Sequence, residues 1–211
     1  MNQPQLSSTT AGKSMLGRMT MNASDARNRL QAGNLRFTSN AATSEPTVHH
    51  ATDEQTISGQ SPYATILTCA DSRVTPEIIF DEGIGSLFVV RTAGAIARSS
   101  QMSSLEFAVG QLNCPLIVVM GHSGCGAIAA TLGYLQGQDV ASPHLQTLVE
   151  HISSCLDNQH LEADEAAKKT AIETCQQIIS TSSMIQQAIA EDKLQVVAAM
   201  YNFLTGGVEF L

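Results

Sequence analysis

The chain has 211 residues, of which 43% are hydrophobic and 14% are charged, a balance typical of one folded domain and not of a disordered protein. Its formal net charge of −8 argues against nucleic acid or an anionic membrane surface as the main partner. No apolar run approaches the roughly 20 residues that a membrane-spanning helix needs, so we expect no membrane partner.

Residues 1–23 are polar and carry two basic residues and no acidic residue ahead of position 24. Two cations are weak support for a targeting peptide, and no apolar core of a secretion signal follows them. We therefore expect a disordered or weakly ordered tail. The five cysteines are an odd number. Without a secretion signal they indicate a reducing compartment, the cytoplasm, and thiolate chemistry in place of disulfides.

A helix is predicted from Ser24 onward, because Ala26, Leu30 and Phe37 recur near one face, with Gly33 as an interruption. The polar stretch 38–60 has few apolar anchors and is predicted to be a loop or an extended arm. This first region would form an N-terminal helical arm.

Four apolar runs follow that are typical of buried strands: 64–67, 86–91, 115–121 and 194–203. Their continuous apolarity favours a parallel sheet covered on both faces. Helical patterns lie between them, one opened by the capping pattern Ser103-x-x-Glu106, one in 124–135, and two or three in 145–191. The sequence predicts an α/β fold, with a central mostly parallel β-sheet flanked by helices, and a single domain over 24–211.

Two stretches begin where an apolar run ends: "TCADSRV" (68–74) and "GHSGCGA" (121–127). Ligands of open α/β sheets bind at the carboxyl ends of the strands, so these stretches are expected to meet there. Charged residues beside a cysteine at the end of a buried strand are costly unless the site uses them.

Cys69, His122 and Cys125 are the candidate metal ligands. His122 and Cys125 are three residues apart, so both side chains can face one point. Two thiolates and one imidazole favour zinc and leave its fourth position open. The alternative is two buried cysteines and a core histidine, but the glycines at 121, 124 and 126 permit tight turns and close approach to a ligand.

Together these motifs resemble those of the β-class carbonic anhydrases, from about Ser24 to the C-terminus. The similar segments are "GNLRF", "GQSPYATILTCADSRVTPEIIFDEGIGSLFVVRTAG", "SSLEFAV", "PLIVVMGHSGCGAI" and "AMYNFLTGGV". The resemblance implies one Zn²⁺ per subunit, bound by Cys69, His122 and Cys125, and an adjoining catalytic pair, Asp71 and Arg73. It implies reversible hydration of carbon dioxide to bicarbonate and a proton by zinc-bound hydroxide.

The chemistry of the pair suits this role. A carboxylate at Asp71 can accept a hydrogen bond from the nucleophile and orient it, and Arg73 can hold that carboxylate through two parallel bonds. The plainer alternative is an exposed ion pair in a turn. Asp71 could also swing onto the metal and close the site. We predict an open site, because Gln60 matches the family's open members and the chain has no Trp, which the bicarbonate-regulated members use.

The resemblance also implies the substrate pocket: Gln60, Phe88, Ala93, Phe107 and the backbone N–H of Gly126. Phe107 would come from the second subunit of a homodimer or homotetramer, whose N-terminal arms cross between subunits. For Phe88, Ala93 and Phe107, ordinary packing explains the residue equally well. Ala95 departs from the family, which often has Asn at this position.

Two other functions remain open at this stage. The same motif on this scaffold serves hydrolysis of carbonyl sulfide or carbon disulfide, whose shape resembles that of carbon dioxide. The chain could also be a non-catalytic zinc-stabilised scaffold or a bicarbonate sensor. The presence of both Asp71 and Arg73 argues against the non-catalytic alternatives.

Overall fold

The computed structural model describes residues 21–42, 59–157 and 161–211. The predicted tail therefore lies outside the described residues except for its last three positions. Most of the predicted arm, 43–58, lies outside them as well.

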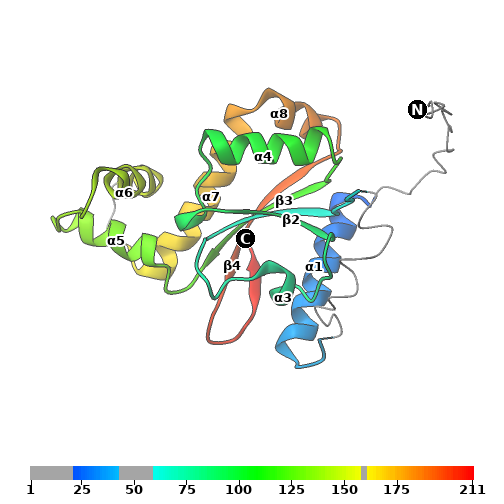
Figure 1. Cartoon of the computed structure of the whole chain (residues 1–211), viewed down its shortest axis with the longest axis horizontal. Coiled ribbons are helices and arrows are strands. Elements are labelled where there is room, and N and C mark those ends of the chain that lie inside the picture. Colours follow the sequence, from blue (N-terminus) through cyan, green and yellow to red (C-terminus); the bar gives the residue numbers. More distant parts are fainter. Residues whose placement is uncertain (1–20, 43–58, 158–160) are drawn as a thin grey trace, which may run out of the picture.

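A five-stranded sheet forms the centre of the structure (Figure 1), in the order β2-β1-β3-β4-β5. Its strands are β1 (Ala64–Thr68), β2 (Leu87–Arg91), β3 (Leu116–His122), β4 (Gln195–Tyr201) and β5 (Val208–Phe210). The first four pair in parallel, and β5 returns antiparallel beside β4. The predicted α/β class with a mostly parallel sheet is confirmed.

Alternating side chains of the central strands enter two separate cores. Ile66 and Val118 pack with Leu30 on the side of α1 (Ala23–Thr38) and α3 (Pro76–Ile79). Leu67 and Val119 pack on the opposite side with α4 (Ser99–Gly110), α7 (Ala163–Thr181) and α8 (Ser183–Ala190). Figure 1 shows these helices on the two faces of the sheet. Because strands alternate their side chains, a strand buried on both faces has to be apolar throughout.

A third core lies beyond the carboxyl ends of β1 and β3. It is built from η2 (Ala93–Ala95), α5 (Gly126–Leu135), α6 (Pro143–Cys155) and the first turns of α7. Cys69 and Cys125 belong to this cluster. The predicted stretch 145–191 therefore forms three helices, α6, α7 and α8, and this places two thiols in an apolar setting at the sheet's end.

Three details differ from the sequence expectations. Helix α1 runs through Gly33 without interruption, and a Cβ at this position would lie 1.8 Å from the carbonyl oxygen of Phe80. Gly33 therefore allows close packing. Helix α4 begins at Ser99, not at Ser103, because Gln101 reaches back to the amide of Arg98. The fourth run ends at Tyr201, and the sequence pattern did not indicate β5.

None of the helices within the described ranges is long and apolar enough to cross a membrane.

Candidate metal centre

The candidate site is built where two neighbouring parallel strands end. Cys69 follows β1 directly, and His122 is the last residue of β3. The hydroxyl of Thr68 donates to the carbonyl of Met120 at 2.9 Å, which fixes the two strand ends to each other. Gly124 has φ +63°, a left-handed conformation that suits glycine, and turns the chain so that Cys125 occupies the N-cap position of α5.

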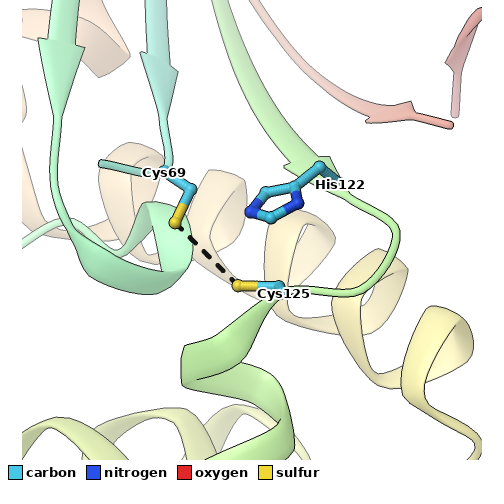
Figure 2. A group of neighbouring side chains, drawn as sticks. All are labelled: Cys69, His122 and Cys125. Atoms are coloured by element: carbon cyan, nitrogen blue, oxygen red, sulfur yellow. Dashed lines mark hydrogen bonds between the residues drawn. The ribbon is translucent and has the colours of Figure 1, made fainter. Parts of the chain in front are cut away.

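Cys69, His122 and Cys125 converge on one point, as predicted for the metal ligands. One potential ligand atom of each lies within 4.8 Å of the others, and the two sulfurs are 3.9 Å apart. All three side chains are buried. Figure 2 shows one ring nitrogen of His122 turned toward the two sulfurs.

The histidine has its tautomer fixed by its neighbour. Its Nδ1 lies 2.9 Å from the carbonyl oxygen of Ser123, which can only accept, so Nδ1 carries the proton. Nε2 then presents a lone pair, and it is buried without a hydrogen-bond partner among the described residues. A buried polar atom without a partner is costly. An external cation would satisfy it.

The two sulfurs lie within hydrogen-bonding distance of each other, and either can be the donor. Their contact lowers the pKa of Cys69 and raises the pKa of Cys125, because one hydrogen between them stabilises a single thiolate and opposes a second. A metal ion would replace that hydrogen and stabilise both thiolates. Two sulfurs and one imidazole nitrogen are a donor set that suits zinc and disfavours magnesium or calcium. The residues present therefore fit a zinc ion.

Asp71 and Arg73 form the pair that the sequence predicts. The Arg73 side chain donates to both carboxylate oxygens, Nε to Oδ1 at 3.0 Å and an Nη to Oδ2 at 2.8 Å. These hydrogen bonds hold the pKa of the Asp71 carboxyl well below its usual range. The side chain of Asp71 is 17% exposed, and that of Arg73 is 58% exposed. The Asp71 carboxyl is therefore ionised, and Arg73 holds it in the loop that follows Cys69.

A cavity of about 10 Å³ adjoins the three donor atoms. This volume has room for roughly one water molecule. Apart from the three donors, its lining consists of small or apolar residues: Gly94, Ala95, Gly121, Ile128, Ala167 and Ala171. The space next to the candidate ligands is therefore small and largely apolar.

The structure does not bring the five predicted pocket residues into this cavity. Gln60 is exposed ahead of β1, and Gly126 is exposed at the first turn of α5. Phe88 of β2 stacks on Phe107 of α4 within the same chain, with ring centroids 6.3 Å apart. Ala93 is half-buried at the start of η2. Their roles remain predictions.

Ala95 does line the cavity, and its φ of +55° lies in the left-handed region. Asparagine tolerates this conformation far better than alanine does. The departure at this position therefore costs backbone strain next to the candidate metal centre.

Three further residues support the site, and the sequence analysis missed their roles. Arg91 donates to the carbonyl oxygens of Cys69 and Asp71, which braces the loop between them. Ser123, in the loop between His122 and Cys125, accepts from the amide of Phe203, which joins this second loop to the turn after β4. Arg91 and Phe203 are the last residues of two predicted strands, 86–91 and 194–203, so position at a strand end was the available signal.

Comparison with known proteins follows the same lines. The family described as carbonic anhydrase matches residues 64–208. Carbonic anhydrase 2 of Mycobacterium tuberculosis is 40% identical over 152 residues, 70% of this chain and 73% of that protein. A carbonic anhydrase of Mycolicibacterium smegmatis is 39% identical over 154 residues, 71% of this chain and 75% of that one. The solved β-carbonic anhydrase CcaA aligns with a TM-score of 0.68 and 26% identity, covering 88% of this chain and 91% of its own.

Proposed function

The chain belongs to the β-carbonic anhydrase family, and on that premise we propose that it catalyses the zinc-dependent hydration of carbon dioxide to bicarbonate and a proton. The observation that carries the proposal is the convergence of two sulfurs and one imidazole nitrogen, all buried, beside an ionised Asp71. Cys69, His122 and Cys125 would hold one Zn²⁺ per subunit.

Bound zinc would supply a nucleophile at neutral pH by lowering the pKa of water. The side chains of the protein contribute orientation. Asp71 can only accept hydrogen bonds while it is ionised, so it fixes the direction of the attacking oxygen's proton. Arg73 holds both carboxylate oxygens and so fixes Asp71 itself. The small, largely apolar lining beside the three candidate ligands limits competing water.

The same ion pair supports an open metal site. We call Cys69, His122 and Cys125 the donor cluster. Both carboxylate oxygens of Asp71 accept hydrogen bonds from Arg73, so the carboxylate is held by Arg73 and does not bind the donor cluster. Leaving that grip would cost Asp71 two charge-assisted hydrogen bonds. The fourth position of the metal would therefore stay available to solvent or substrate.

We further propose that residues 24–211 act as one domain, in a homodimer or homotetramer. Large apolar side chains at the surface support assembly, among them Ile78, Ile84 and Phe107, each about half exposed. All five cysteines are free and buried, which favours the reducing cytoplasm as the compartment.

The direct test is stopped-flow carbon dioxide hydration by the zinc-loaded protein. We expect Asp71→Asn to lower kcat by about 10²- to 10⁴-fold, because an amide can orient the nucleophile's proton only weakly and receives no charge-assisted bond. Asp157→Asn is the matched control, since Asp157 is exposed and paired with Lys169 away from the site. This control should keep the full rate.

Hydration at the uncatalysed rate by the zinc-loaded wild type would refute the proposal and favour a zinc-stabilised scaffold or a bicarbonate sensor. The same instrument with carbonyl sulfide and carbon disulfide addresses the remaining alternative. We expect carbon dioxide to be turned over fastest, and the opposite order would reassign the substrate.

A further inference from the structure

Phe203 lies in the turn after β4 and contacts two members of the site through its ring. The guanidinium carbon of Arg73 stands 4.2 Å from the ring centroid, over the face of the ring. The imidazole of His122 approaches with its centroid 5.1 Å away and its plane tilted by 57°. One aromatic side chain thus connects the candidate catalytic pair with a candidate metal ligand.

The ring itself is held in place from three sides. The amide of Phe203 donates to the hydroxyl of Ser123 at 2.9 Å, and the amide of Ser123 donates to the carbonyl of Tyr201 at 2.9 Å. The ring of Tyr201 meets Phe203 edge-on with centroids 5.4 Å apart. Phe203 also packs against the core on the α1 side of the sheet. Phe203 is therefore a rigid surface at the edge of the site.

Arg73 needs such a surface. Its side chain is long and more than half exposed, so holding it in one conformation costs side-chain entropy. The Asp71 carboxylate fixes the end of the guanidinium, and the ring of Phe203 supports its plane. A planar cation that lies over an aromatic face gains an electrostatic attraction that a free rotamer lacks.

We propose that Phe203 is a positioning residue for catalysis, whose ring holds the Arg73 guanidinium in the orientation in which it grips both oxygens of Asp71. The inference rests on the function proposed above, since it matters only if Asp71 orients the nucleophile. Phe203 does not line the cavity beside the donors. Its loss should therefore lower kcat and leave KM unchanged.

The size of the effect follows from the contact. A cation–π contact at a half-exposed site shifts an equilibrium by about two- to fivefold. We expect Phe203→Leu, which keeps an apolar side chain but removes the ring, to lower kcat by about that factor. Phe203→Tyr keeps the aromatic face and should restore the wild-type rate.

A spectroscopic readout tests the position of Arg73 without relying on activity. In the metal-free protein, the chemical shift of the Arg73 Nε–H proton should combine the downfield shift from its hydrogen bond to Asp71 with an upfield ring-current shift from Phe203. The signal is assigned by its loss in Arg73→Lys. We expect it to keep its position in Phe203→Tyr and to move in Phe203→Leu, where the ring current is lost.

The matched control is Phe210→Leu. Arg27 lies over the ring of Phe210 with its guanidinium carbon 5.0 Å from the centroid, on α1 and β5 and away from the candidate ligands. This variant should leave both kcat and the Arg73 signal unchanged, while shifting the signal of Arg27.

Two results would overturn the inference: an Arg73 signal that does not move in Phe203→Leu, or a loss of kcat that follows a loss of bound zinc in proportion. Failure of the proposed function looks different. In that case wild type and variants are all inactive, while the Arg73 signal still reports whether the ring holds the guanidinium.

Discussion

Two regions of this molecule bury ionisable groups, and they treat them in opposite ways. The first region, which we call the acid cluster, lies beside α1. It consists of Asp81 and Glu82 with their partners Arg29, Arg36 and Tyr63. Glu82 accepts hydrogen bonds from Nε and Nη2 of Arg29 and from the Tyr63 hydroxyl, and Arg36 donates a hydrogen bond to Asp81. At the ends of β1 and β3, the three potential metal ligands of the donor cluster face one another instead. Nε2 of His122 has no hydrogen-bond partner among the described residues.

The difference separates a structural network from a site. In the acid cluster the chain itself supplies each charge with its opposite, so the energy of burial is recovered within the fold. In the donor cluster only soft lone pairs meet, and they repel unless a cation or protons lie between them. Burial alone does not mark function, whereas the convergence of three buried metal-binding atoms on one point does.

The largest expected effect breaks the donor cluster. Cys69→Ser should lower zinc affinity by more than about 100-fold, since even the residues that orient metal ligands are worth about 10- to 100-fold. Activity should fall to background. Without metal, Cys69→Ser should melt at or below the wild-type temperature, because the variant loses the contact between the two sulfurs inside an apolar cluster. With excess zinc, only the wild type should gain stability.

Zinc competition with a chelator and melting with and without zinc provide these measurements. Cys155→Ser is the control, because Cys155 is equally buried but belongs to no donor group among the described residues. Full zinc occupancy in Cys69→Ser would remove Cys69 from the ligand set.

The next effect breaks the acid cluster. Arg29→Ala leaves the Glu82 carboxylate, whose side chain is 3% exposed, without its cation. We expect a loss of about 3 kcal/mol in the free energy of unfolding, because a buried charge without its partner is strongly destabilising. Denaturant titration measures it. In contrast to Cys69→Ser, zinc should stabilise this variant as much as it stabilises the wild type.

Lys193→Ala is the comparison for that variant, because its ion pair with Glu191 lies at the surface. Exposed ion pairs contribute little, so the unfolding midpoint should not move. If Arg29→Ala unfolded at the wild-type midpoint too, the acid cluster would not contribute to stability as we infer.

The smallest effect sharpens the comparison at a third place. His151 on α6 has its Nε2 buried without a hydrogen-bond partner among the described residues, yet no donor cluster surrounds it. Burial, with the charge of Arg98 nearby, lowers its pKa in spite of a contact with Gln177. The unfolded chain therefore binds this proton more readily than the folded one.

It follows that His151 takes away stability as the pH falls below the ordinary histidine value of 6.5 and has no effect well above it. His151→Gln should reduce the loss of stability between neutral and acidic pH, measured by denaturant titration across that range. An unchanged pH dependence would mean that His151 does not titrate differently in the folded state.

The local pattern of the sequence determined much of this protein. Continuous apolar runs predicted β1 to β4, because a strand buried on both faces has few polar positions. The spacing of Cys69, His122 and Cys125 at strand ends predicted the donor cluster, because parallel strands present their carboxyl ends together. The pairing of Asp71 with Arg73 also follows from short spacing.

The tertiary structure decided what depends on contacts between distant segments. From the sequence, Gly33 was expected to interrupt the helix, and only the close contact with the backbone of Phe80 explains why glycine is needed there. Strand β5 is too short to produce a recognisable sequence pattern. The contact of Phe203 with Arg73 joins segments far apart in the sequence and has no local signature. The cavity likewise includes Ala95 and excludes Phe107, because only packing fixes which apolar side chains reach a given point.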